Sequence, residues 1–129
     1  MTYCCVIDLR KADDRVWRTG LWKRLWDEGK RRKMWRVLKD FYIHTQNCVL
    51  ARSTKTDFID VDVGVRQGCV LSPVLFSIYI NGLAKEVASS SLGIDVDGKN
   101  VAILLYADDI VLIAGSIESL QSQIDITSI

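Results

Sequence analysis

The hydrophobic pattern of the N-terminal half changes from strand-like runs to helical spacing and back. A short β-prone apolar run over residues 3–8 predicts a buried strand that ends at a carboxylate. Apolar residues at helical spacing then predict helices over residues 12–28 and 31–45. Alternation on both sides of a polar turn predicts a β-hairpin from residues 48–52 and 58–63. The expected inward-facing residues of the two helices are Trp17, Leu21 and Leu25, and Met34, Val37, Leu38, Phe41 and Tyr42.

The C-terminal half begins with a loop over residues 64–68 and continues as a helix. Ser72 is a typical N-cap and Pro73 suits the first helical position, so we expect a helix over residues 73–89. That helix is apolar nearly all round, which predicts that it is the most buried one. Further strands are expected over residues 93–96, 101–106 and 110–114, with a turn at Asp97-Gly98 between the first two. A helix that Ser116 caps is expected to follow. Helices that interrupt antiparallel strands indicate the α+β class, and the length favours one domain.

Charge is distributed unevenly along the chain. Of the 17 Lys and Arg residues, 12 lie within the first 50 positions, whereas only 6 of the 16 Asp and Glu residues do. The helix expected over residues 31–45 is basic, and clustered cations of this kind neutralise nucleic-acid phosphates. A solvated surface helix is the alternative interpretation. The basic residues proposed to contact a nucleic-acid backbone are Lys30, Arg31, Arg32, Lys33 and Arg36.

The cysteines and the apolar runs exclude several classes of protein. Four cysteines without paired metal-ligand spacing predict reduced, buried thiols. No apolar stretch reaches the roughly 18 residues of a membrane span, so we expect a soluble, intracellular chain, nuclear or cytoplasmic, with no readable targeting signal. The four tryptophans are expected in a core, because aromatic residues at helical spacing more often pack than bind bases.

Asp108 and Asp109 stand at the tip of the hairpin expected from residues 101–106 and 110–114. Its nearly continuous apolar runs predict strands covered by other structure, where adjacent carboxylates need a cation or a donor to offset lost hydration. Asp8 closes another apolar strand. If that strand lies in one sheet with the hairpin, Asp8 adds a third carboxylate next to Asp108 and Asp109. Such a cluster suits two divalent ions roughly 3.5–4 Å apart. The alternative is an acidic turn, with Asp8 as a helix N-cap.

Three motifs in this order resemble the reverse transcriptases of non-long-terminal-repeat (LINE-type) retrotransposons. They are Asp-Leu-Arg-Lys-Ala-Asp-Asp-Arg-Val at residues 8–16, Gly-Val-Arg-Gln-Gly-Cys-Val-Leu-Ser-Pro-Val-Leu-Phe at residues 64–76, and Tyr-Ala-Asp-Asp at residues 106–109. Group II intron maturases share the layout, but the wording of the second motif is more similar to the retrotransposon branch.

The resemblance implies that residues 1–129 are a partial reverse transcriptase domain. It would be the polymerase palm, an antiparallel sheet packed on helices, truncated at both ends so that fingers and thumb are missing. The implied reaction is RNA-templated DNA synthesis by two-metal nucleotidyl transfer, with an RNA template, a DNA primer and deoxynucleoside triphosphates as partners. Asp8 and Asp108 would be the main ligands of two Mg²⁺ ions, with Mn²⁺ as an alternative, and Asp109 would complete the cluster.

The resemblance also assigns residues to nucleotide and template binding. Gln67 and Gly68 match the family's loop over the templating pair and the incoming nucleotide, and glycine lets a backbone approach a base closely. Arg66 either meets phosphate or is solvated. Without the other motifs, these residues would be a plain connecting loop.

Asp13 departs from the family pattern, which reads Lys-Ala-Phe-Asp where this chain has Lys-Ala-Asp-Asp. In the family, the aromatic residue packs under the sugar of the incoming nucleotide and collides with a 2′-hydroxyl. A carboxylate lacks that apolar wall and can accept a hydrogen bond from the hydroxyl. We therefore expect poor selection of deoxynucleotides and a weak or inactive isolated chain.

Two other classes of function remain open from the sequence. The chain could be a non-catalytic nucleic-acid-binding or scaffold protein that retains the palm fold, or a decayed remnant of a retrotransposon polymerase. Salt-dependent RNA binding that survives loss of metal and of Asp108 would favour the binding protein. A remnant would aggregate or be degraded when it is expressed alone.

Overall fold

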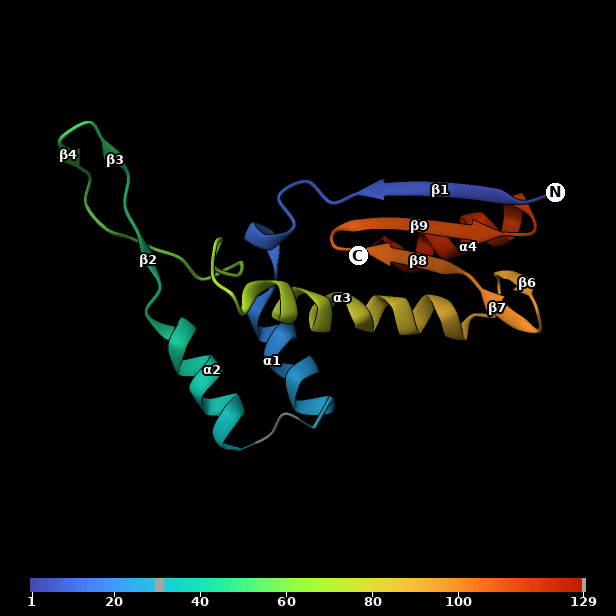
Figure 1. Ribbon diagram of the computed structural model, residues 1–129, viewed down its shortest axis with the longest axis horizontal. Helices are drawn as coiled ribbons and strands as arrows, with labels where there is room; N and C mark the ends of the chain where they lie inside the picture. Colours follow the sequence, from blue (N-terminus) through green and yellow to red (C-terminus); the bar gives the residue numbers. More distant parts are fainter. Residues whose placement is uncertain (30–31, 129) are drawn as a thin grey trace. The chain divides into compact units, whose positions relative to one another are not determined.

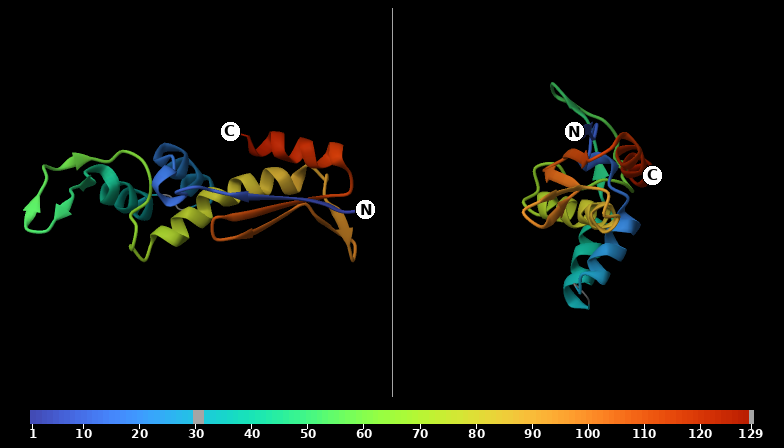
Figure 2. Two further views of the ribbon diagram at one scale, coloured as in Figure 1. Left: turned by 90° about the horizontal axis from the view of Figure 1, so that it is seen from above. Right: turned by 90° about the vertical axis from the view of Figure 1, so that its right-hand side faces the viewer.

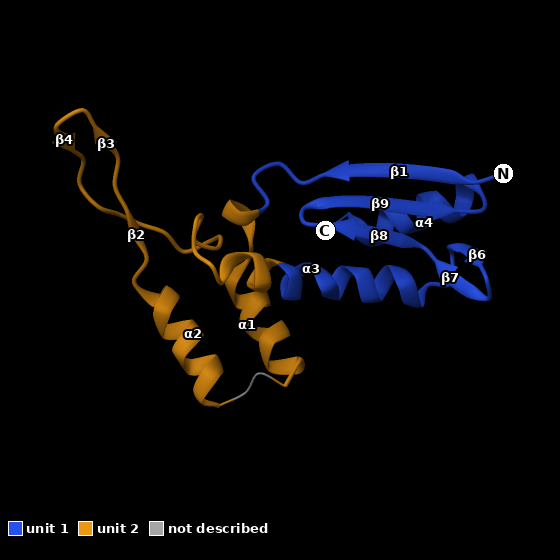
Figure 3. Cartoon of the chain, in the orientation of Figure 1, with its two compact units in different colours: residues 1–12, 77–129 blue, residues 13–76 orange. Residues whose placement is uncertain are grey.

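The computed structural model describes residues 1–29 and 32–128, and the chain divides into two compact units (Figures 1 and 3). The sheet unit consists of residues 1–12 and 77–129, and the helix unit of residues 13–76. Helices and antiparallel strands together confirm the predicted α+β class. Within the described ranges, no helix has both the length and the apolar character that a membrane crossing requires.

Three antiparallel strands form the main sheet of the sheet unit. Their order is β1 (Tyr3–Asp8), β9 (Asp109–Ala114) and β8 (Ile103–Tyr106), so the predicted first strand does join the predicted hairpin. Helix α4 (Ile117–Thr127) lies along β9 and β1 (Figure 2). Ser116 caps α4 as predicted, because its Oγ accepts a backbone hydrogen bond from the first turn.

The two faces of this sheet differ in burial. Ile110, Leu112 and Ala114 of β9 are almost fully buried, and they alternate with less buried residues as the pleat requires. Gln123 of α4 is also buried and donates a hydrogen bond from its Nε2 to the carbonyl of Ile113, at 3.0 Å. The opposite face carries exposed apolar side chains, among them Val6 and Leu104.

A second, smaller hairpin belongs to the sheet unit. Strands β6 (Ile94–Val96) and β7 (Lys99–Val101) pair across a two-residue turn. Asp97 and Gly98 both have positive φ in this turn, 52° and 76°, which is the pattern of a type I′ turn. The predicted turn is therefore confirmed.

Helix α3 (Ser72–Ser89) begins in the helix unit and ends in the sheet unit. Its bounds match the predicted helix to within one residue. Leu75, Phe76, Ile80 and Val87 are buried, but Val74 is 56% exposed. Val74 is therefore an exception to the burial that was expected of this helix.

The helix unit is built from η1 (Asp13–Arg15), α1 (Arg18–Asp27) and α2 (Lys33–Ile43). The helix predicted from residue 12 starts later, because residues 13–15 form a 3₁₀ turn. Between α1 and α2, the rings of Trp22 and Tyr42 lie 5.6 Å apart. The core residues of the unit are Val16, Leu21, Leu25, Tyr42, Val65, Leu75 and Phe76.

The inner face predicted for α2 is only partly correct. Tyr42 is buried, but Met34, Val37 and Phe41 are 58%, 55% and 43% exposed. Helix α1 packs against the side that carries Trp35 and Tyr42, and Trp35 donates from Nε1 to the carbonyl of Trp22 at 2.9 Å. Apolar residues occupy two neighbouring sides of α2, and α1 covers one of them.

Two further expectations of buried side chains are wrong in part. Trp17 and Trp26 are 61% and 44% exposed, so these two tryptophans are not core residues. All four cysteines are free, but Cys4 is exposed and the other three are half-buried. Trp17 precedes α1 instead of lying within it, which explains why its helical spacing does not produce burial.

The hairpin predicted after α2 forms as two short ladders. Strand β2 (Gln46–Asn47) pairs with β5 (Ile59–Asp60), and β3 (Leu50–Ala51) pairs with β4 (Thr54–Lys55). Most side chains of this ribbon are exposed, so no core supports longer strands.

Candidate functional site

Asp8 and Asp109 lie opposite each other in the sheet unit, as the last residue of β1 and the first of β9. Directly opposed residues of an antiparallel pair project from the same face, with Cβ atoms about 4.5–5.5 Å apart. Tyr106 of β8 is paired with Asp109 from the other side. Strand register therefore brings two carboxylates together at one end of the exposed face.

Asp108 is part of the turn that joins β8 to β9. Because Tyr106 pairs with Asp109, only Ala107 and Asp108 form the turn. Ala107 has a φ of 53°, which is the left-handed region, and this sign at the first position is typical of a type II′ hairpin turn. Asp108 is therefore the second residue of a tight turn whose first position usually requires glycine, and Asp109 follows it as the first residue of β9.

The environment of these carboxylates differs from the sequence prediction. Asp8, Asp108 and Asp109 are exposed, and Tyr106 is 83% exposed. Covered strands that force the carboxylates out of water are therefore not observed, because α4 protects the other face of the sheet.

The donor set fits a hard divalent cation. Carboxylate oxygens are the ligands that Mg²⁺ prefers, and Asp8 and Asp109 supply two such groups on one face. In the part of the chain that the structure describes, no three His, Cys, Asp or Glu side chains gather closely enough to hold a metal ion. The three-carboxylate site stays a prediction, and the Asp8–Asp109 pair is the part of it that the structure brings together.

The loop over residues 64–68 lies in the helix unit and is packed tightly on η1. The amide of Gly64 donates to the carbonyl of Val16 at 2.8 Å, and the amide of Val65 donates to the carbonyl of Asp13 at 2.7 Å. Gly64 has a φ of 79°, and an added Cβ would lie 2.8 Å from the carbonyl oxygens of both Asp13 and Asp14. This approach is possible only for glycine.

Gln67 and Gly68, the residues assigned to template and nucleotide binding, end this loop in exposed positions. The Nε2 of Gln67 donates to Oδ1 of Asp14 at 3.0 Å. Gly68 has a φ of 76°, and no atom lies within 4 Å of the place where its Cβ would be. Asp13, the expected sugar-contacting residue, is half-buried.

Arg66 is held by the protein. Its Nη2 donates to the carbonyl of Phe41 at 2.7 Å and to Oγ1 of Thr45 at 3.4 Å. The guanidinium carbon lies 4.1 Å from the ring centroid of Phe41 and 5.5 Å from that of Tyr42, which are cation–π distances. Arg66 is thus half-buried against two aromatic rings.

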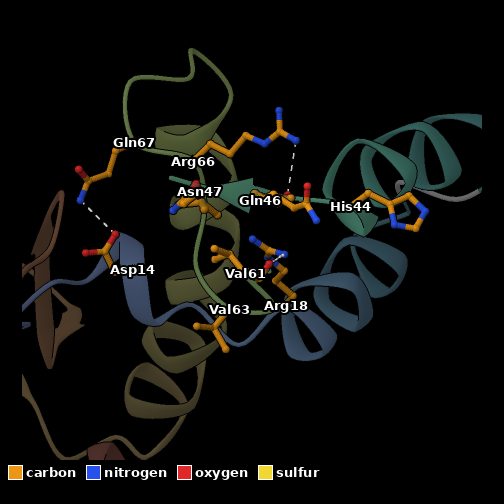
Figure 4. Close-up of a pocket in the computed structure, with 11 residues that line it drawn as sticks. Asp14, Arg18, His44, Gln46, Asn47, Val61, Val63, Arg66 and Gln67 are labelled. Carbon is orange, nitrogen blue, oxygen red and sulfur yellow. Dashed lines mark hydrogen bonds between the residues drawn. The ribbon is translucent and has the colours of Figure 1, made fainter. Parts of the chain in front are cut away.

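A cavity of about 720 Å³ lies within the helix unit, beside Gln67 (Figure 4). Most of its polar lining was not expected from the sequence. The lining residues are Asp14, Arg18, His44, Thr45, Gln46, Asn47, Val61, Val63, Val65, Arg66 and Gln67. Its size is in the range of small-molecule sites, roughly 300–1,000 Å³.

Arg18 is the most deeply buried charged residue of this lining, with 8% of its surface exposed. Its Nε donates to the carbonyl of Gly64 at 2.8 Å, and its Nη1 donates to the carbonyls of Val61 and Tyr42 at 2.5 and 3.2 Å. Burial lowers the pKa of Arg18, and nearby Tyr42 and Asp62 oppose that shift. Its spacing with Leu21 and Leu25 on the buried stripe of α1 was the available sequence signal.

The basic residues of α2 are only partly described. Arg32, Lys33 and Arg36 are exposed at its beginning, as a surface that contacts phosphates requires. Lys30 and Arg31 lie outside the described residues. Lys39 lies over the ring of Trp35 at 4.9 Å and is half-buried, so it is less available.

Comparison with known proteins gives one family and several relatives. The family described as reverse transcriptase (RNA-dependent DNA polymerase) matches residues 1–128. The RNA-directed DNA polymerase from mobile element jockey of Drosophila funebris is 31% identical over 115 residues, 87% of this chain. The same protein of Drosophila melanogaster is 31% identical over 113 residues, 85% of this chain.

A third relative comes from another element. The retrovirus-related Pol polyprotein from type-1 retrotransposable element R2 of Nasonia vitripennis is 27% identical over 126 residues, 95% of this chain. The chain spans 12% of the length of each of these three relatives. These matches confirm the resemblance to LINE-type retrotransposon proteins. With a family match over nearly its whole length, the chain belongs to the reverse transcriptase (RNA-dependent DNA polymerase) family.

Proposed function

We propose that this chain carries the metal-binding part of an RNA-directed DNA polymerase palm, with Asp8, Asp108 and Asp109 as ligands of two Mg²⁺ ions. The observation that carries the proposal is the register of β1 and β9, which opposes Asp8 and Asp109 on an exposed face. Family membership supports the same chemistry. At these carboxylates, Mg²⁺ would supply activation of a primer 3′-hydroxyl and stabilisation of the charge on the leaving pyrophosphate.

Further residues of the two units have supporting tasks in this proposal. The exposed face of the sheet leaves room for a primer end and a triphosphate beside Asp8 and Asp109. Gln67 and Gly68 would contact the templating pair and the incoming deoxynucleoside triphosphate. Arg66 supports the loop that carries them, since its guanidinium is bonded to the backbone at Phe41.

Asp13 sets an expectation for nucleotide selection. A carboxylate at the proposed sugar-contacting position leaves no flat apolar wall against a ribose, so activity with deoxynucleotides is expected to be weak. Asp13→Phe should raise extension with deoxynucleotides relative to ribonucleotides. Unchanged extension and selection in this variant would remove Asp13 from the nucleotide site.

Primer extension by the purified chain tests the catalytic proposal. We expect weak, Mg²⁺-dependent extension of a DNA primer on an RNA template, and complete loss in Asp8→Asn or Asp108→Asn. Asp97→Asn is the matched control, since Asp97 is an exposed turn aspartate of the same unit. Primer extension that persists in Asp8→Asn would contradict the proposal. So would the absence of any primer extension by the Asp13→Phe chain.

A non-catalytic nucleic-acid-binding protein is the second candidate function. The exposed cations Arg32, Lys33 and Arg36 at the beginning of α2 favour it. Binding through phosphates weakens steeply with salt, because each contact releases counterions. RNA binding that survives Asp108→Asn and removal of metal, but is lost when these three cations become glutamine, would support this candidate.

A further inference from the structure

The hydrogen bond between Gln67 and Asp14 fixes which end of the Gln67 amide is available to a ligand. An ionised carboxylate only accepts hydrogen bonds, so the partner of Asp14 Oδ1 must be the Nε2 of Gln67. The amide oxygen of Gln67 is then directed away from Asp14, as Figure 4 shows. Gln67 therefore presents an acceptor, whereas a freely rotating glutamine presents a donor or an acceptor equally.

Several hydrogen bonds hold the loop that carries Gln67 in place beside Asp14. Asp14 belongs to η1, on which the loop is packed through Gly64 and Val65. Arg18 holds the carbonyl of Gly64 at 2.8 Å. Past Gln67, Ser72 Oγ donates to the carbonyl of Arg66 at 2.5 Å and closes the loop onto the start of α3. Both ends of the loop are thus fixed relative to Asp14.

We propose that Asp14 is a positioning residue that makes Gln67 an acceptor for the ribose 2′-hydroxyl of an RNA strand. This inference rests on the proposed function, in which Gln67 faces an RNA template. The 2′-hydroxyl is a donor as well as an acceptor, and it distinguishes RNA from DNA at a given site. A fixed acceptor at Gln67 recognises that donor.

Ribose fits this acceptor better than a base does. Base donors differ between adenine, guanine and cytosine, so an acceptor that reads them would make template binding depend on sequence. Every RNA residue has a 2′-hydroxyl, so one fixed acceptor serves all templates. Gln67 also belongs to the lining of the cavity of about 720 Å³.

The helix unit contains a matched second pair for comparison. Gln46 Nε2 donates to Asp60 Oδ1 at 2.7 Å, so the same chemistry occurs between β2 and β5. This pair lies outside the loop of residues 64–68, although Gln46 also lines the cavity. Asp60→Asn therefore makes the same change of charge and hydrogen bonding as Asp14→Asn at a site to which no template role is assigned.

The experiment compares binding of the full chain to two single-stranded oligonucleotides of one sequence, RNA and 2′-fluoro RNA, by fluorescence anisotropy. The fluorine removes the 2′-hydroxyl donor. One hydrogen bond predicts about three- to tenfold tighter binding of RNA by the unmodified chain. Gln67→Met should reduce this ratio to about one. Asp14→Asn should reduce it about halfway, because the substituted amide can donate as well as accept and so lets the Gln67 amide turn. Asp60→Asn should leave the ratio unchanged.

Each contrary result has a distinct meaning. A ratio that Asp14→Asn does not change, while RNA still binds, would overturn the acceptor role and leave the proposed function standing. An equal fall in Asp60→Asn would show a general effect of charge and would also overturn it. Absence of binding to both oligonucleotides would contradict the proposed function and the acceptor role together.

Discussion

The two units place their candidate functional residues in different ways. In the sheet unit, Asp8 and Asp109 owe their proximity to strand register, and both side chains are exposed. In the helix unit, Gln67 depends on a loop held by the backbone of η1, by Arg18 and by a glycine that permits close packing. The carboxylates can therefore be changed without disturbing the fold, whereas the loop and the stability of its unit are coupled.

Of the proposed substitutions, Arg18→Met should lower stability most, and it tests whether the loop and the stability of the helix unit are coupled. It leaves the carbonyls of Gly64, Val61 and Tyr42 without their charged donor, at a cost of about 3 kcal/mol or more in the helix unit. All four tryptophans lie in this unit, so fluorescence-detected urea unfolding reports its stability. An unchanged midpoint would mean that Arg18 does not hold the loop.

Gly64→Ala should have the next largest effect, about 2 kcal/mol in the same measurement. The new Cβ meets two carbonyl oxygens at 2.8 Å and occupies a backbone with φ of 79°. Gly68→Ala is the matched control, because its φ is similar but its Cβ meets no atom within 4 Å. We expect about 1 kcal/mol for Gly68→Ala, and equal losses would contradict the packing of the loop on η1.

Asp109→Asn should change the stability of the sheet unit by less than about 0.5 kcal/mol, as exposed substitutions usually do. The substitution also removes the repulsion between Asp109 and Asp8, so we expect a small gain in the stability of the sheet unit and not a loss. Hydrogen exchange of the β9 amides measures this unit separately. A large loss of protection would show that the carboxylate has a structural role.

Glu118 should give the smallest effect, and one that depends on pH. A hydrogen bond with its own backbone amide, followed by one with Ser116, lowers its pKa in the folded chain. A lowered pKa adds stability above the unfolded value, and that stability is lost as the pH falls through the folded value. Glu118→Gln should therefore weaken the sheet unit slightly at neutral pH, and the difference should vanish in acid. A difference that persists in acid would have another cause.

The sequence predicted the carboxylate pair better than it predicted the loop. Asp8 was expected beside the hairpin because it closes an apolar strand that can join the hairpin in one sheet, and the order β1, β9, β8 confirms this. The burial of those strands was predicted wrongly, since apolar runs do not reveal which face a helix covers. The exposed side chains of Tyr106 and Val6 show that one face of these strands is not covered.

The contacts of Arg18 and of Asp14 could not be predicted from local pattern. The partners of Arg18 are carbonyls 24 to 46 residues away in the chain, and Gln67 is 53 residues from Asp14. Helical spacing also placed Met34 and Phe41 inside, because it cannot tell which of two adjacent apolar sides of α2 meets α1. Long-range packing decided these positions.

The central claim is that Asp8 and Asp109 form a metal site together with Asp108. Titration of Mn²⁺ into the ¹⁵N-labelled chain, observed by NMR, tests it most directly, because the ion broadens amides near its site. We predict broadening centred on residue 8 and residues 108–110, and its loss in the Asp8→Asn, Asp109→Asn double variant but not in Asp97→Asn. Broadening centred elsewhere, or unchanged in the double variant, would contradict the claim.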